Sequence, residues 1–215
     1  MFDFIALKNN TGIILYTDYK TLKSFHEVMI EVHETSCLIK HKEAGFLMDI
    51  QYETRKACEG LRQVLQPPPC MPELGVRYGI EAYWPVLLVQ CRMLRESLAY
   101  IGSTKRQQAI TYALEDVIEA AINEVFGPNA KLVLERWNRI DPRDTTLEGK
   151  LDSRCIQFMR WSRTERKNNL PGLLASLDFM YPYFYLNRVN NGEVGLVSPD
   201  EYDALNGEVW ETPKP

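Results

Sequence analysis

The sequence has few of the residues and motifs that mark common enzymes and extracellular proteins. Its 215 residues include three histidines and five widely spaced cysteines, none in a C-x-x-C pair. This pattern predicts neither a disulfide framework nor a zinc ribbon, so we interpret the cysteines as reduced, mostly buried thiols. No G-x-S-x-G, G-x-G-x-x-G or G-x-x-x-x-G-K-[ST] motif occurs. Serine hydrolase elbows, dinucleotide loops and phosphate loops therefore lack support, and we expect no cofactor and no common enzyme.

Long apolar runs are also missing. No stretch of about 18 apolar residues occurs, as a membrane span would need. The first twelve residues lack the basic leader, apolar block and cleavage site of a signal peptide. The net charge of −4 and the pI near 5.5 disfavour non-specific binding to nucleic acid or anionic membranes. We expect a cytoplasmic protein that binds no membrane.

The composition that remains is that of a folded globular chain, with 45% hydrophobic and 25% charged residues. At this length we expect one structural unit with an appended subdomain. The expected parts are an α+β core domain over residues 1–126, a helical extension packed on it over 127–210, and a flexible tail over 211–215.

The N-terminal third indicates a small sheet and two helices. Two β-prone runs flank the turn sequence Asn9-Asn10-Thr11-Gly12 and predict a hairpin. Thr17 and Asp18 offer an N-cap for a helix to about Glu34, and a second helix is expected from Phe46 to Glu59. The proline-rich segment 67–72 predicts an extended connection, followed by a strand near 76–80 that joins the hairpin.

The strongest periodic signal predicts an antiparallel helical hairpin. One helix opens at Trp84-Pro85 and presents an apolar face to Ile101, where Gly102 ends it. Thr104 and Gln107 form a capping box for the next helix, which has its own apolar stripe to Val125. Only Gly102 and Ser103 separate the two predicted helices. We expect this pair to be the buried centre of the fold.

Further helices are expected after residue 127. Thr145 and Glu148 suggest a capping box for a helix to about Arg166, and Asn168-Asn169 then interrupts the chain. Residues 173–180 look helical, and Ser198-Pro199 predicts a last short helix. The expected class is α+β and predominantly helical, with a small antiparallel N-terminal sheet packed on a central antiparallel helical hairpin and further helices after it.

Histidine and cysteine suggest one weak metal site. If the first helix continued past Glu34, then His33, Cys37 and His41 would follow at i, i+4 spacing, which can bring three ligands to zinc. Thr35-Ser36 weakens that helix, and no fourth ligand is evident. We therefore assign no metal site and keep a metal protein, or an enzyme of unfamiliar type around His26 and His33, as an alternative.

Charge is unevenly distributed in the last third. Residues 131–170 hold ten Lys or Arg and six acids, whereas residues 171–215 hold two basic residues and seven acids. The simplest interpretation is that the acidic tail faces the basic helices in the fold or an oligomer. An alternative is that this region binds nucleic acid or a partner through phosphate contacts and stacking aromatics. The candidate residues are Arg160, Trp161, Arg163, Arg166, Lys167, Tyr181, Tyr183 and Tyr185.

Several short motifs resemble a family of small uncharacterised bacterial proteins. They are Asn9-Asn10-Thr11-Gly12-Ile13, Asp18-Tyr19, Leu22, His26, Ile50-x-Tyr52-x-x-Arg55-x-Ala57 and Tyr83-Trp84-Pro85-Val86-Leu87-Leu88. The resemblance covers the first 125 residues, and the extension from Gly127 departs from the shorter members. It implies a bacterial, cytoplasmic α+β domain and carries over no functional residue.

The leading hypothesis is a non-enzymatic protein–protein interaction module, such as an inhibitor, immunity or regulatory protein. Its expected partner is another protein or a second copy of itself. This hypothesis rests on the many aromatic surface candidates and the missing catalytic set. The alternatives are a nucleic-acid-associated protein that uses residues 131–170 with 181–185, and the metal protein or unfamiliar enzyme.

Overall fold

The fold is α+β and predominantly helical, with a small antiparallel sheet near the N-terminus, as the sequence predicts. The computed structural model describes residues 1–39 and 47–210. The chain forms two compact units. Unit 1 consists of Met1–Ala6, Gly12–Tyr83 and Met93–Ala121, and unit 2 consists of Leu7–Thr11, Trp84–Arg92 and Ile122–Pro215.

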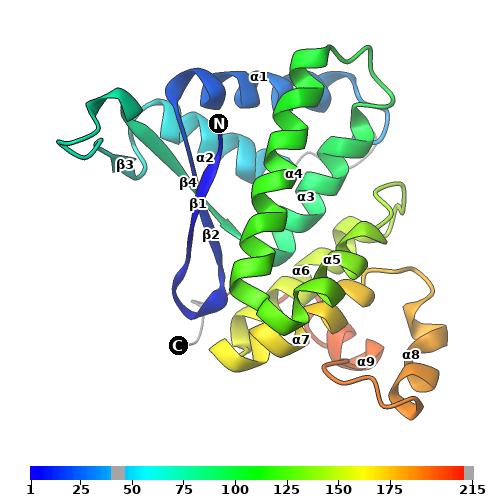
Figure 1. The fold of residues 1–215 in the computed structure, drawn as a ribbon. Helices are drawn as coiled ribbons and strands as arrows, with labels where there is room; N and C mark the ends of the chain where they lie inside the picture. Colours follow the sequence, from blue (N-terminus) through cyan, green and yellow to red (C-terminus); the bar gives the residue numbers. More distant parts are fainter. Residues whose placement is uncertain (40–46, 211–215) are drawn as a thin grey trace. The chain divides into compact units, whose positions relative to one another are not determined.

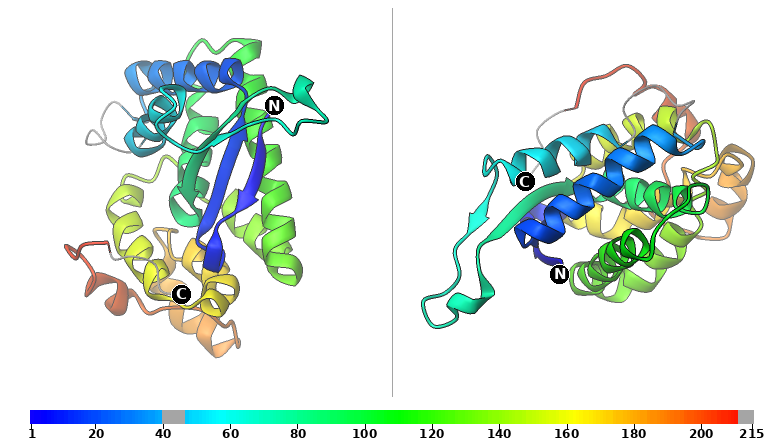
Figure 2. Two further views of the ribbon diagram at one scale, coloured as in Figure 1. Left: turned by 90° about the vertical axis from the view of Figure 1, so that its left-hand side faces the viewer. Right: turned by 90° about the horizontal axis from the view of Figure 1, so that it is seen from above.

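The sheet of unit 1 contains the predicted hairpin and the strand that joins it (Figure 1). Its antiparallel strands, in the order β1-β2-β4-β3, are β1 (Asp3–Ala6), β2 (Gly12–Thr17), β3 (Val64–Leu65) and β4 (Arg77–Tyr83). Strand β3 was not predicted. The proline-rich segment, with the short 3-10 helix η2 (Pro72–Leu74), connects β3 to β4 and projects from the sheet (Figure 2). It is therefore a connection within one unit.

Two helices pack beside each other and against strand β4. They are α1 (Tyr19–Thr35) and α2 (Met48–Cys58). Helix α1 begins as predicted, because the Asp18 carboxylate accepts a 2.9 Å hydrogen bond from the backbone N–H of Thr21. The rings of Phe2 and Phe25 meet edge to face at 5.5 Å. Leu22, Phe25, Met29 and Val32 are buried and form the apolar side of α1.

The predicted helical hairpin is present as α3 (Trp84–Ser97) and α4 (Lys105–Phe126). Their antiparallel pairing is visible where the Arg95 guanidinium lies 3.8 Å from the Tyr112 ring centre. The predicted capping box also forms, with Thr104 N–H donating to Gln107 Oε1 at 2.6 Å. The two-residue turn is wrong, because α3 ends at Ser97 and residues 98–104 connect the helices. The division between the units falls within α3 and α4, so both helices contribute to both units.

Unit 2 is helical and packs around tryptophan side chains. Trp84 meets Phe126 edge to face at 5.3 Å, and Trp137 donates its indole N–H to the carbonyl of Leu88 at 2.8 Å. The elements after α4 are η3 (Gly127–Asn129), α5 (Ala130–Asn138), α6 (Leu147–Arg160), α7 (Arg163–Ala175), α8 (Tyr181–Asn190) and α9 (Pro199–Asp203).

Three predictions about these helices are wrong. The helix expected from Thr145 to Arg166 is divided at Trp161, where the backbone is extended, and the Ser162 side chain begins α7 in a capping box with Glu165. The expected interruption at residues 168–169 lies inside α7. The capping box expected at Thr145 does not form either, because Thr146 is the N-cap of α6 and makes no side-chain capping bond.

The N-caps of α4 and α7 give the first prediction. Replacing Thr104 or Ser162 with alanine should each lower the free energy of unfolding by about 1 kcal/mol, because a helix N–H loses its acceptor. Thr145→Ala is the matched control, since Thr145 caps no helix, and should change it by less than about 0.5 kcal/mol. Urea unfolding followed by circular dichroism measures all three. Equal losses in the three variants would contradict the assigned helix starts.

Candidate interaction surface

Helix α8 has a buried side that anchors it to unit 2. Pro182 stands in its first turn, where proline is favoured. Tyr181, Tyr185 and Arg188 follow at i, i+4, i+7 spacing and share the inward face. The Tyr181 hydroxyl donates to the Val197 carbonyl at 2.8 Å, and the Tyr181 and Tyr185 rings lie 5.8 Å apart. Burial raises the pKa of the Tyr181 hydroxyl.

The opposite side of α8 is apolar and exposed. Tyr183 is 77% exposed and Leu186 is 69% exposed, and Phe179, which precedes the helix, is 62% exposed. Phe184 and Val189 flank them and are also exposed. We call these five residues the α8 face. An exposed apolar group of this density, built on one helix and the turn before it, is typical of a contact surface.

The candidate residues for nucleic-acid or partner binding are not on one surface. Trp161, Arg166 and Tyr181 are buried, whereas Arg163 and Tyr183 are exposed. Lys167 and Tyr185 are half-buried, and Arg160 forms an ion pair with Glu208. The sequence therefore identified the aromatic run but not which of its side chains face solvent, and it missed Phe179, Leu186 and Val189.

Acidic side chains of the last third pair with the basic helices. Besides the Arg160–Glu208 pair, Arg136 donates to Glu193 at 2.7 Å. The fully buried Arg166 has a structural role, because its guanidinium donates to the carbonyls of Phe158, Met159 and Asn9 at 2.9–3.1 Å. Several of the arginines in residues 131–170 are thus already paired with acids or carbonyl groups of unit 2.

The candidate metal ligands do not converge where the structure describes them. Helix α1 ends at Thr35 and Ser36 is extended, so Cys37 is not on the helix that carries His33. His41 lies outside the described residues. Within the described ranges no group of three His, Cys, Asp or Glu side chains could hold a metal ion. Burial of the five thiols was overestimated, since Cys37 and Cys70 are exposed.

His26 gives a pH-dependent prediction for unit 1. Burial lowers the pKa of its imidazole below the ordinary 6.5, and the positive charge of Arg55 lowers it further. The unfolded chain then takes up the proton more readily than the folded chain. The folded chain is therefore most stable, as far as His26 is concerned, above pH 6.5, where the imidazole is neutral in both states. Its free energy of unfolding decreases as the pH falls below that value.

His26→Gln should remove that part of the pH dependence. Urea unfolding from pH 8 to pH 5 should show the stability of the variant rising relative to the wild type as the pH falls. A difference between the two proteins that stays constant over this range would show that His26 titrates alike in the folded and unfolded states.

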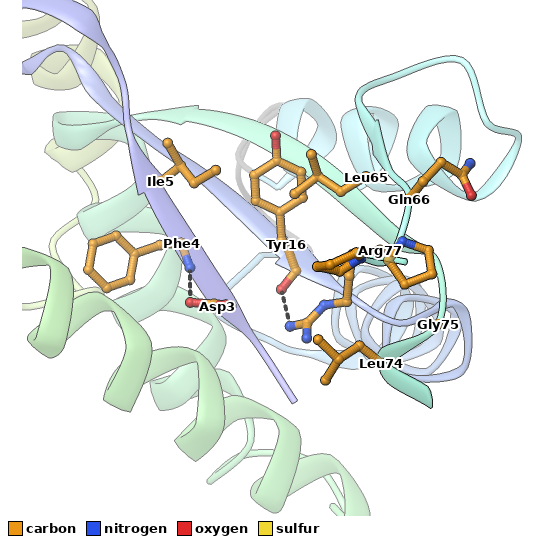
Figure 3. A pocket seen from close by; sticks show the side chains of 11 residues that line it. Asp3, Phe4, Ile5, Tyr16, Leu65, Gln66, Leu74, Gly75 and Arg77 are labelled. Carbon is orange, nitrogen blue, oxygen red and sulfur yellow. Dashed lines mark hydrogen bonds between the residues drawn. The ribbon is translucent and has the colours of Figure 1, made fainter. Parts of the chain in front are cut away.

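A second surface feature is a hollow of about 250 Å³ in unit 1. Figure 3 shows Ile5 and Leu65 beside the Tyr16 ring, with Leu74 on the segment that leads into β4. The Tyr16 hydroxyl donates to Gln63 Oε1 at 2.5 Å, and the ring crosses β4 at Gly79, where an added Cβ would lie 2.8 Å from it. Any larger residue at that crossing would displace the side chain of Tyr16 or Ile14.

The charged side chains that line this hollow form hydrogen bonds mainly with backbone atoms. Arg77 donates to the carbonyl of Met1 at 3.0 Å. It also donates to the carbonyl of Tyr16 at 3.3 Å, and Asp3 accepts from the backbone N–H of Phe4 (Figure 3). No pair of groups suited to acid–base chemistry lines the hollow. It is an apolar depression at a sheet, and it offers fewer large exposed side chains than the α8 face.

Comparison with known proteins identifies a family. The family model described as "Domain of unknown function (DUF6904)" matches residues 5–184, and the chain belongs to this family. The match extends beyond the 125 residues on which the resemblance rested. No curated protein and no solved structure is significantly similar to the chain. Among the helices in the described part of the chain, none is long and apolar enough to cross a membrane.

Proposed function

We propose that this member of the family acts without a catalytic step, by binding another protein through the α8 face. The observation that carries the proposal is the exposure of Tyr183 and Leu186 on one side of α8, together with that of Phe179 in the preceding turn, while the other side of the helix is anchored. Aromatic and large aliphatic side chains of this kind form the energetic centre of protein interfaces. The bacterial and cytoplasmic setting expected from the sequence stays a prediction.

The α8 face also defines the chemistry of the partner. A helix that presents side chains at i, i+3 and i+4 spacing fits an apolar groove. Residues 171–210 contain one basic residue, Arg188, and six acids. The partner should therefore offer an apolar groove with lysine or arginine at its rim, because complementary charge favours encounter and orientation.

The test compares two leucines of similar exposure. Leu186→Ser removes the centre of the α8 face, whereas Leu61→Ser changes a side chain of unit 1 that is 60% exposed. Both variants and the wild type are used to capture proteins from the native host, and the captured proteins are identified by mass spectrometry. We expect a protein that the wild type and Leu61→Ser retain and that Leu186→Ser loses.

Direct binding must then be reproduced with purified components. Leu186→Ser should weaken it by about 2 kcal/mol, the usual cost of removing a central interface side chain. The mass of the wild type from light scattering should be that of a monomer. If the wild type is instead a dimer and Leu186→Ser is a monomer, the partner of the α8 face is a second copy of the chain. Equal binding by both variants would contradict the proposal.

A further inference from the structure

Three arginines from different elements of unit 2 surround a small hollow on the inner side of α8. Arg136 lies on α5, Arg139 directly follows α5, and Arg188 lies on α8. The hollow has a volume of about 50 Å³, and Asp178 and Leu174 are among the other side chains that line it. Arg188 shares the inward face of α8 with Tyr181, so this site is distinct from the α8 face.

Positive charge exceeds negative charge among the residues that line this hollow. Glu193 is shared, because one of its oxygens accepts from Arg136 Nη2 at 2.7 Å and lies 3.6 Å from Arg188 Nη1. Asp178 uses an oxygen to accept from the backbone N–H of Met180 at 2.8 Å. The lining thus carries three guanidinium groups and one carboxylate, whereas Glu193 and Glu135 act on Arg136 from outside the lining.

Two donors of these guanidinium groups are buried and lack a hydrogen-bond acceptor. They are Arg136 Nε and Arg188 Nη1. Leaving such donors unsatisfied is costly, and native proteins rarely do so. Burial lowers the pKa of Arg136, and the charges of Arg188 and Arg139 lower it further, despite the opposing charges of Glu193 and Glu135. An anion in the hollow would relieve the repulsion among the three guanidinium groups that line it.

We propose that this hollow binds a phosphate group, either inorganic phosphate or the phosphoryl group of a small metabolite. One water molecule needs about 10–15 Å³ of such space, so a volume of about 50 Å³ admits a compact oxyanion. Guanidinium groups match the oxygens of phosphate with paired hydrogen bonds. Three converging cations suit phosphate better than a carboxylate, which offers two oxygens and a single charge.

The binding test uses the full chain and inorganic phosphate at constant ionic strength. We expect calorimetry to show saturable binding of one phosphate per chain. Arg139→Gln and Arg188→Gln should each weaken it about tenfold, the effect of losing one charge-assisted contact. Arg139 is exposed, so its replacement leaves folding intact. Arg143→Gln, which removes an exposed arginine paired with Asp141, is the matched control and should bind as the wild type does.

Glu193→Gln should strengthen phosphate binding, whereas the arginine variants weaken it. It removes the carboxylate that competes for Arg136 and Arg188, so phosphate should bind about three- to tenfold more tightly. A purely structural role for Glu193 would give no such gain. Titrations with acetate and glucose 6-phosphate complete the test. The proposal is overturned if phosphate shows no saturable binding, if acetate binds more tightly, or if Glu193→Gln weakens binding as the arginine variants do.

Discussion

Arg166→Met should lower the free energy of unfolding by about 3–5 kcal/mol, the largest effect we expect from a single substitution. The guanidinium group is completely buried and donates to carbonyl oxygens of Phe158 and Met159, in the last turn of α6, and to that of Asn9. Methionine fills much of the same space but leaves these acceptors unsatisfied. The positive charge also suits the C-terminal end of a helix, so its loss adds to the cost.

The control is Arg163→Met on the same helix, where the side chain is exposed. It should change the free energy of unfolding by less than about 0.5 kcal/mol. Arg166→Lys should recover only part of the loss, because an ammonium cannot reproduce the planar fork of donors. Urea unfolding of the three variants measures these differences. Similar stability of Arg166→Met and Arg163→Met would contradict the buried position of Arg166.

Gly172→Ala should destabilise the protein by about 3 kcal/mol, although alanine is normally the better helix former. An added Cβ would lie 2.1 Å from the carbonyl oxygen of Gly195, a backbone atom that cannot rotate away. Gly195 itself has a φ of 75°, which restricts how its segment could adjust. The chain from Glu193 to Val197 must therefore shift, and the hydrogen bond from Tyr181 to Val197 would shift with it.

Gly149 supplies the matched control on α6. It is exposed, and no atom lies within 4 Å of an added Cβ. Gly149→Ala should stabilise the protein by about 0.5–1 kcal/mol, because only the helix preference changes. In thermal and urea unfolding, Gly149→Ala should be more stable than the wild type and Gly172→Ala less stable. Stabilisation by Gly172→Ala would show that α7 and the segment at Gly195 are not in contact.

Local signals account for the parts of the fold that were predicted correctly. The Asp18 cap, the Thr104–Gln107 box and the Ser198 cap are side-chain hydrogen bonds made within four residues, so the sequence contains both partners. The hairpin of β1 and β2 is equally local, because its connection uses Asn9 and Asn10 at positive φ.

Contacts distant in sequence decide the features that were missed. Strand β3 exists because Val64 and Leu65 pair with β4, and two residues carry no periodic signal of their own. The break at Trp161 places Arg166 under the end of α6, although the Ser162–Glu165 box could have indicated a new helix. Asn168 and Asn169 stay helical because packing of α7 outweighs their weak preference.

The candidate surface was predicted only in part for a similar reason. The aromatic run at 181–185 was recognised, but its helical face depends on which side chains unit 2 buries. The i, i+4, i+7 spacing of Tyr181, Tyr185 and Arg188, together with Pro182 at the first turn, could have indicated the helix and its buried side. The exposure of Leu186 and Phe179 could not be read from the pattern alone.

The central claim is that the α8 face contacts a protein partner. Photocrosslinking in the native host tests it most directly, with benzoylphenylalanine in place of Tyr183 or, as a matched control, in place of Tyr100, which is exposed in unit 1. We expect one defined adduct with another protein from position 183 and none with that protein from position 100. An adduct of equal yield from both positions, or none from position 183, would contradict the claim.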